Sequence, residues 1–188
     1  MRLSLKLSVV ITAFIFCSCG DETSEANEAP AANSEQIPAK EVVVKADTVN
    51  SPELVVAQVD GSLLLTAQNG KAVGPEIKYM PEWRAFGWFT AADRVEWDVD
   101  VNKGAQYEVH LEWSVSNEEA GKEFLLEAKD DKLTGKVGPS GSWETYKNEN
   151  VGKIKLSAGR QPIIFKSKTK FDKGGLLDLR EIKLVPAG

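Results

Sequence analysis

The stretch that decides the fold covers residues 94–113, which read RVEWDVDVNKGAQYEVHLEW. Apolar side chains alternate with charged or polar ones in both halves of this stretch. The apolar positions are Val95, Trp97, Val99 and Val101 in the first half and Tyr107, Val109, Leu111 and Trp113 in the second. Strict alternation is typical of a half-buried β-strand, and Gly104 lies in the short segment between the halves. The stretch therefore predicts a β-hairpin that turns at residues 102–105, with Trp97 and Trp113 in the core.

Similar short runs recur along the rest of the chain. They cover Leu54–Gln58, Leu63–Ala67, Phe124–Ala128, Lys153–Leu156 and Ile163–Lys166. Turn residues such as Asp60 and Gly61 separate them, and no stretch has a convincing helical period. The pattern predicts an all-β domain, an antiparallel sandwich or barrel. In the last run, Leu177–Leu184, the apolar parity changes after Leu179, which predicts a β-bulge near Arg180.

The first 18 residues have the features of a secretory signal. Arg2 and Lys6 precede an apolar run that ends at Phe16, which is too short to span a membrane. The segment Phe16-Cys17-Ser18-Cys19-Gly20 resembles a lipobox, in which the cysteine after a small residue is acylated and becomes the N-terminus. We therefore expect a lipoprotein signal peptide over residues 1–18 and lipid on Cys19, a lasting membrane anchor. A cleaved signal without lipid is the alternative.

Residues 19–50 are predicted to be a disordered acidic linker, followed by one folded domain over residues 51–188. The segment is rich in Glu, Ala, Ser, Asn and Pro and has no aromatic residue. Asp21 and Glu22 resemble the acidic tag that sends lipoproteins to the cell's outer face in some Gram-negative bacteria. We expect a lipid-anchored protein of the outer membrane or cell surface in a bacterium. The alternative is that these acids simply begin the linker.

Composition and charge exclude several classes of function. Both cysteines, Cys17 and Cys19, lie in the first twenty residues, so the predicted domain has neither a disulfide nor a thiolate metal site. Without residues 1–18 the chain has 21 basic and 28 acidic residues, a net charge of -7. Nucleic acid favours the opposite sign, so no nucleic-acid partner is expected.

The predicted domain also lacks the residues of common catalytic sites. The one histidine, His110, lies on the polar face of a predicted strand, and Ser140-Gly141-Ser142 lacks the surroundings of a nucleophile elbow. The acidic residues Glu96, Asp98, Asp100, Glu108 and Glu112 alternate outward on what the pattern predicts to be adjacent strands, as on a solvated sheet face. We expect no enzyme activity and no required cofactor, with a carboxylate-pair glycosidase as the minor alternative.

Three of the five tryptophans are not explained by alternation. Trp83, Trp88 and Trp143 lie beside proline, glycine and serine in predicted loops or strand ends. An indole there can offer its face to the apolar face of a sugar. The alternative for each residue is that it caps the core.

The order of several motifs resembles known carbohydrate-binding modules. The motifs are Gly87-Trp88, Asp93 to Trp97, Gly104 to Val109, Gly141 to Tyr146, Gly152, Leu156 to Gly159 and Leu177 to Ile182. Between about Asp60 and Pro186 the chain resembles family 6 and family 35 carbohydrate-binding modules. The resemblance implies a jelly-roll, galactose-binding-like β-sandwich that binds carbohydrate without catalysing a reaction.

The resemblance also implies a loop site made of two aromatic residues and an amide. Trp88 and Trp143 match the aromatic positions, with Trp83 as a further candidate, and Asp178 lies where an asparagine often stands. A carboxylate accepts hydrogen bonds but cannot donate them as an amide does. These modules commonly hold a structural calcium, and Gln68 stands where an early-strand Glu would be expected, so we treat calcium as a hypothesis.

The leading hypothesis is a surface lipoprotein that binds poly- or oligosaccharide near partner glycosidases or sulfatases. Its membrane contact would be through the lipid anchor alone. The rival is a structural or protein-interaction sandwich whose aromatic residues are all buried. The exposure of Trp88 and Trp143 separates the two.

Overall fold

The computed structural model describes residues 49–188, which contain twelve β-strands and no helix. The strands are β1 (Val55–Val56), β2 (Leu63–Thr66), β3 (Lys71–Val73), β4 (Lys78–Met80), β5 (Ala85–Gly87), β6 (Arg94–Val101), β7 (Ala105–Ser114), β8 (Glu123–Glu127), β9 (Lys132–Lys136), β10 (Lys147–Leu156), β11 (Gly159–Ser167) and β12 (Asp178–Pro186). The predictions for residues 1–18, Cys19 and most of the linker lie outside this range. In the described range there is no helix long and apolar enough to cross a membrane.

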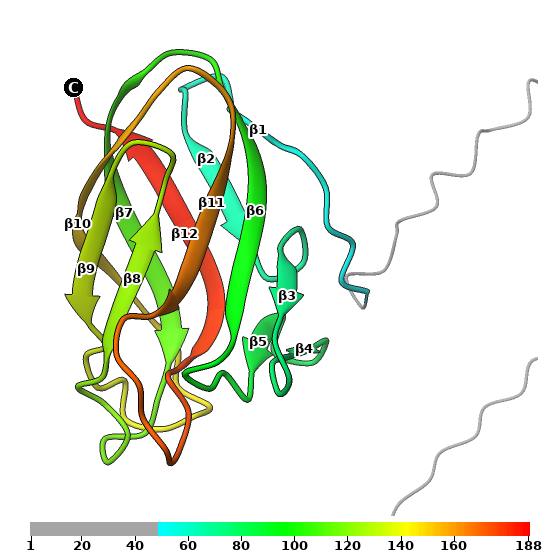
Figure 1. Ribbon diagram of the computed structural model, residues 1–188, viewed down its shortest axis with the longest axis vertical. Coiled ribbons are helices and arrows are strands. Elements are labelled where there is room, and N and C mark those ends of the chain that lie inside the picture. The colour runs from blue at the N-terminus through cyan, green and yellow to red at the C-terminus, as the bar shows by residue number, and fades with distance from the viewer. Residues whose placement is uncertain (1–48) are drawn as a thin grey trace, which may run out of the picture. The chain divides into compact units, whose positions relative to one another are not determined.

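The strands form two six-stranded sheets that pack face to face (Figure 1). One sheet has the order β1-β6-β11-β8-β9, and β3 also pairs with β6. The other has the order β10-β7-β12-β5-β4, and β2 also pairs with β12. All pairs are antiparallel except β1 with β6. The all-β sandwich predicted from the alternating runs is therefore confirmed.

The core lies between the sheets and includes the alternating apolar residues of β6 and β7. Trp97 of β6 and Trp113 of β7 are each 1% exposed. Their indole N–H groups donate to the Thr66 carbonyl at 2.9 Å and the Gly138 carbonyl at 3.0 Å. Because a buried donor without a partner costs free energy, these bonds make full burial of both indoles possible.

The predicted hairpin of β6 and β7 is wrong. The two strands lie in different sheets, where β6 pairs with β11 and β7 pairs with β10 and β12. The segment after Val101 carries the chain across the core from one sheet to the other, so the apolar rows of the two strands face each other. Glu96, Asp98 and Asp100 consequently point away from Glu108 and Glu112 on opposite sides of the sandwich, and the prediction that these acids share one face is also wrong.

Two other local predictions are confirmed, the bulge in the last strand and the position of His110 on a polar strand face. The register of β12 against β7 shifts between Leu179 and Glu181, at the predicted bulge. His110 is half-buried on the polar side of β7, with its Nε2 atom 3.9 Å from a carboxylate oxygen of Glu108. Asn50, the last residue of the predicted linker, donates from its side-chain amide to the carbonyls of Ala67, Gln68 and Gly70.

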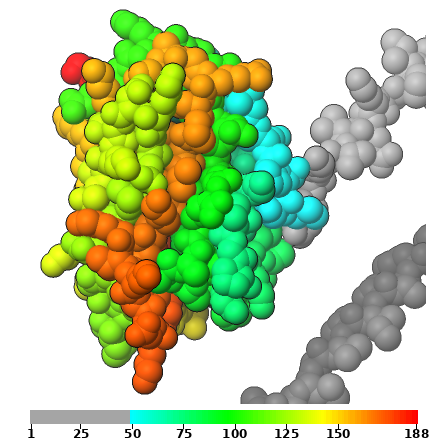
Figure 2. Space-filling view, viewed as in Figure 1, coloured from blue at the N-terminus to red at the C-terminus, as the bar shows by residue number. Residues whose placement is uncertain are grey.

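Long connections gather at one end of the sandwich. They are the segments 88–93, 115–122, 137–146 and 168–177, and they precede or follow strands of both sheets. Figure 2 shows the outer face of β9, β8, β11 and β6 as a filled surface, with the segment after β11 projecting at this end. Loops of both sheets meet here, so residues far apart in the sequence can form one site.

Candidate functional site

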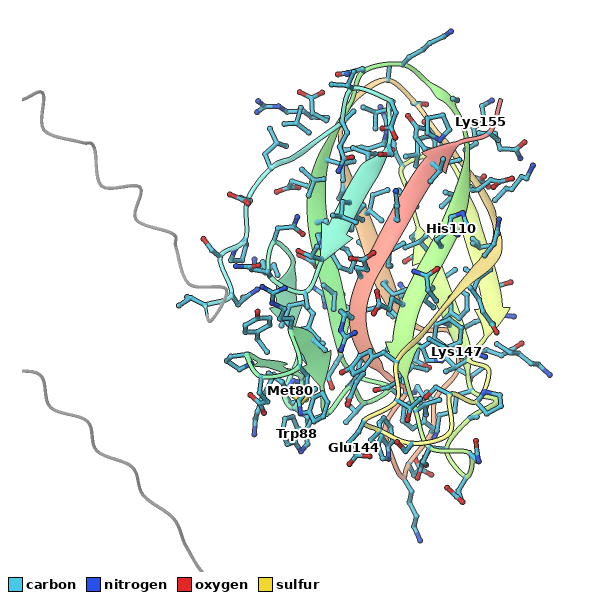
Figure 3. All side chains as sticks on the ribbon, turned by 180° about the vertical axis from the view of Figure 1, so that it is seen from behind. Met80, Trp88, His110, Glu144, Lys147 and Lys155 are labelled. Carbon is cyan, nitrogen blue, oxygen red and sulfur yellow. The ribbon has the colours of Figure 1, made fainter. Side chains whose placement is uncertain are left out.

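A hollow of about 280 Å³ lies at the loop end of the sandwich. It is lined by Met80, Trp88, Phe89, Trp143, Gly175 and Asp178, which come from β4, β12 and three connections. Figure 3 shows Met80, Trp88 and Glu144 together at this end, away from His110 and Lys155. We call this feature the loop hollow. It brings together three of the four predicted sugar-binding residues, Trp88, Trp143 and Asp178.

Trp88 presents its indole to solvent because the backbone reverses at this residue. Its φ is 52°, in the left-handed region, and the residue is 58% exposed, whereas the next residue, Phe89, is fully buried. The Phe89 carbonyl accepts a hydrogen bond of 2.6 Å from the Leu176 N–H. Asp93 accepts bonds from the Thr90 N–H and hydroxyl at 2.8 and 2.6 Å. These bonds hold the segment in place, so the structure maintains an exposed, strained tryptophan.

Gly87 allows two hollow residues to approach the backbone of β5. A Cβ atom at this position would lie 2.7 Å from the Met80 Sδ and Cε atoms and 2.9 Å from Asp178 Oδ1. The Met80 thioether and the Asp178 carboxyl therefore lie against the backbone at the base of the hollow. Because Gly87 has no side chain, part of the loop hollow beside Trp88 stays open.

Trp143 forms the opposite wall and lies over the backbone of Gly175. A Cβ atom at Gly175 would be 3.0 Å from the Trp143 Cη2 atom. The Trp143 carbonyl accepts a bond of 2.6 Å from the hydroxyl of Ser114, a buried residue at the end of β7. Ser140 closes the same loop, because its hydroxyl oxygen accepts a bond of 2.8 Å from the Val115 N–H. This loop is thus tied to β7, and the Trp143 indole is partly buried.

Asp178 is the titratable group of the loop hollow. Burial, and to a smaller extent the negative charge of Glu144, raise the pKa of its carboxyl from 3.8 to about 7. Within residues 49–188 the carboxyl has no hydrogen-bond donor and no ion-pair partner. Burial without a hydrogen-bond donor or an ion-pair partner therefore leaves this carboxyl partly protonated at neutral pH.

Trp83 does not line the loop hollow. Its ring stacks on Tyr146, with centroids 6.2 Å apart and an interplanar angle of 26°. The Arg180 guanidinium carbon lies 3.5 Å from the Tyr146 ring centroid, and its Nη1 atom lies 2.7 Å from a Glu112 oxygen. The Arg180 Nε–H donates to the Trp83 carbonyl at 3.2 Å. Trp83 therefore belongs to an adjacent stack with Tyr146 and Arg180.

The described residues contain no group of three His, Cys, Asp or Glu side chains arranged to hold a metal ion. Gln68, the position compared with an early-strand Glu, borders a different hollow together with Ser51 and Thr66. Asp178 and Gln68 thus line separate depressions. Calcium remains a hypothesis from the resemblance.

Sequence reasoning missed the remaining walls of the loop hollow. Met80 belongs to β4, a strand of three residues that is too short for an alternating pattern to predict it. Phe89 and Gly175 reach the site only because their segments bond to each other through Leu176. Glu144, next to Trp143, lies within the motif Gly141 to Tyr146, but its effect on the pKa of Asp178 depends on the fold.

No family model matches the sequence, and no curated protein matches it. Similar solved structures are found by fold. A family 35 carbohydrate-binding module from Clostridium thermocellum has a TM-score of 0.54 at 12% identity, over 67% of this chain and 98% of the module. The family 6 module of Cellvibrio mixtus lichenase 5A, in complex with cellotriose, has a TM-score of 0.53 at 16% identity, over 66% and 97%.

A third structure is an exo-β-1,3-galactanase from Phanerochaete chrysosporium with bound β-1,3-galactotriose. It has a TM-score of 0.54 at 19% identity, over 68% of this chain. The chain matches only 30% of the length of that enzyme. The domain therefore has the β-sandwich fold of family 35 and family 6 modules, as the order of motifs predicted.

Proposed function

We propose that the domain binds carbohydrate in the loop hollow and catalyses no reaction. The observation that carries this proposal is the grouping of Trp88, Trp143 and the partnerless Asp178 carboxyl around one open hollow. Sugar-binding sites need an apolar surface for the C–H face of a pyranose and polar atoms for its hydroxyl groups. The two indoles provide the first, and the carboxyl provides the second.

The exposure of Trp88 favours binding over a purely structural role. The rival hypothesis requires every loop aromatic to be buried, but Trp88 is 58% exposed and has a left-handed backbone. Strain of this kind costs about 1 kcal/mol or more and is common at ligand sites. A core-capping residue would gain nothing from either feature. Trp83, in contrast, has the contacts of a structural residue.

The fold supports the same proposal. The Cellvibrio module was solved with cellotriose, a neutral β-glucan fragment, and the match extends over nearly its whole length. The ligand of this chain does not follow from that complex, because identity is 16%. The cellotriose complex makes oligosaccharides the first class of ligand to test.

We further propose that the domain is a bacterial lipoprotein carried on the outer membrane or cell surface by lipid on Cys19. The tether would hold polysaccharide near partner enzymes such as glycosidases or sulfatases. A domain fixed at a surface meets a polymeric ligand at high effective concentration, so weak individual sites suffice. This part of the proposal comes from the leader sequence and the composition of residues 19–50.

Affinity electrophoresis of the full-length chain through gels that contain neutral, acidic or amino polysaccharides tests the proposal. We expect retardation by at least one polysaccharide and a loss of at least about tenfold in affinity for Trp88→Ala, as for a central aromatic contact. Trp83→Phe is the matched control, because it alters an indole outside the hollow. No retardation in any gel would contradict carbohydrate binding.

The carboxyl groups of Asp178 and Glu144 make a second measurement necessary. A pair of carboxyl groups is also found in glycosidases. Incubation of each retained polysaccharide with the protein, followed by a reducing-end assay, is expected to show no release. Release that disappears in Asp178→Asn would contradict a purely binding role.

A further inference from the structure

In the described part of the chain, the Asp178 carboxyl is acted on by a negative charge and is paired with no positive one. It has no ion pair within residues 49–188, and the charge that acts on it most is Glu144, which is also negative. Burial in the hollow and this neighbour both oppose its ionisation. A ligand that carries a positive group would relieve both effects at once.

Two cationic side chains lie near the loop hollow, and neither pairs with Asp178. Arg180 pairs with Glu112, stacks on Tyr146 and donates to the Trp83 carbonyl. The Lys78 Nζ atom lies 5.5 Å from the centroid of the Trp88 ring, at the exposed edge strand β4. Neither Arg180 nor Lys78 forms a bond with Asp178, so a ligand can supply the positive group that pairs with this carboxylate.

The walls of the loop hollow are suited to a cation. The indoles of Trp88 and Trp143 line the hollow together with the carboxyl. A cation is attracted to the face of an aromatic ring, most strongly to that of tryptophan, and more so where water is reduced. An acidic sugar would meet two like charges, Asp178 and Glu144. A neutral sugar would donate hydroxyl hydrogen bonds but would bring no positive charge to stabilise the ionised form of Asp178.

We propose that the loop hollow selects saccharides that carry a free amino group, an inference that rests on the proposed carbohydrate site. The ammonium of the sugar pairs with the Asp178 carboxylate, and the sugar ring stacks on Trp88. The ammonium provides a charge-assisted hydrogen bond, which is stronger than the bond from a hydroxyl. Trp143 and the Glu144 charge add to the attraction from the opposite wall.

Calorimetric titration of the full-length chain at pH 6 with three β-1,4-linked tetramers tests this selectivity. The tetramers are those of glucosamine, N-acetylglucosamine and glucose, which differ only at C2. We expect the glucosamine tetramer to bind at least about tenfold tighter than the other two. Equal or tighter binding of a neutral tetramer would overturn the selectivity and leave carbohydrate binding intact. Absence of binding to all three would overturn the selectivity, and only failure in every polysaccharide gel would overturn the site itself.

Substitutions separate a local charge contact from general attraction. Asp178→Asn keeps the shape of the side chain and is expected to lose about tenfold affinity for the glucosamine tetramer, with a smaller effect on the glucose tetramer. Asp98→Asn removes the same charge from β6 of the other sheet and is expected to have little effect. An equal loss in both variants would show diffuse attraction to an acidic protein and would overturn the proposal.

Proton release provides a readout that does not depend on comparing affinities. At pH 6 the Asp178 carboxyl is mostly protonated, because burial and Glu144 raise its pKa to about 7. Pairing with an ammonium requires the carboxylate, so the wild-type chain should release protons as it binds the glucosamine tetramer. Titration in buffers of different ionisation heat measures this release. No release from wild type, or the same release from Asp178→Asn, would contradict the pairing.

Discussion

Replacement of Asp178 by asparagine should make the domain more stable at neutral and alkaline pH. The pKa of this carboxyl is raised from 3.8 to about 7, mainly by burial and then by Glu144. The folded state therefore holds the proton more tightly than the unfolded chain does. The stability linked to this proton is present in full below about pH 4 and is lost as the pH rises through about 7.

The size of the effect follows from the pKa difference. A difference of about 3 units at 1.36 kcal/mol per unit gives a ceiling of about 4 kcal/mol above pH 7. The hollow is open to solvent, and water that reaches the ionised carboxylate lowers this cost. We expect Asp178→Asn to gain about 2 kcal/mol over wild type at pH 8 and to gain little at pH 4.5.

Urea unfolding of the full-length chain at several pH values between 4.5 and 8 measures this difference. Asp98→Asn is the matched control, because it changes the same residue type on an exposed strand position. Its difference from wild type should vary little with pH. A gap between wild type and Asp178→Asn that stays constant from pH 4.5 to 8, or a less stable variant at pH 8, would refute the reasoning.

Three further predictions concern the backbone of the site and the anchor. Trp88→Gly should raise the free energy of unfolding by about 1 kcal/mol, since it removes a left-handed non-glycine residue, and should abolish retardation in polysaccharide gels. Gly87→Ala should change stability by less than about 1 kcal/mol, because the atoms nearest to its Cβ are at the ends of the Met80 and Asp178 side chains, but it should narrow the hollow and weaken oligosaccharide binding in calorimetric titration. Cys19→Ala should move the protein from the membrane fraction to the soluble fraction with an unchanged urea unfolding curve; continued membrane association would contradict the lipid anchor.

The alternating runs predicted the faces of the strands but not their partners. Alternation in residues 94–113 placed Trp97 and Trp113 in the core, where both lie. The same pattern fits a hairpin within one sheet and an arch between two sheets, because both turn each apolar row inward. The choice depends on whether β11 or β7 reaches the edge of β6, and that contact joins residues far apart in the sequence. The parity change in β12 was predictable because a bulge is local.

The short strands were missed for a different reason. β3, β4 and β5 have three residues each, too few to show a period of two. β9 is KLTGK, which is polar enough to suggest a loop, and it joins the sheet only as the edge partner of β8. Pairing with an existing sheet stabilises such segments, and propensity alone does not.

The candidate site was predictable only in part. The position of Trp88 after Gly87 and of Trp143 after a Gly-Ser pair indicated exposed aromatics in loops, and both line the loop hollow. Trp83 had similar neighbours in sequence but stacks on Tyr146 instead. The raised pKa of Asp178 could not be predicted, because it depends on burial by the fold and on Glu144 from another loop.

The most direct test of a carbohydrate site at the loop hollow is the response of the five indole N–H signals in ¹⁵N NMR spectra. Each tryptophan gives one signal, and the full-length chain would be titrated with the tetramers of glucosamine and glucose. We predict that saturating ligand shifts the signals of Trp88 and Trp143. The signals of Trp97 and Trp113, which are buried and bonded to carbonyls, should stay in place. Shifts confined to Trp83, or binding that leaves Trp88 and Trp143 unchanged, would contradict the account.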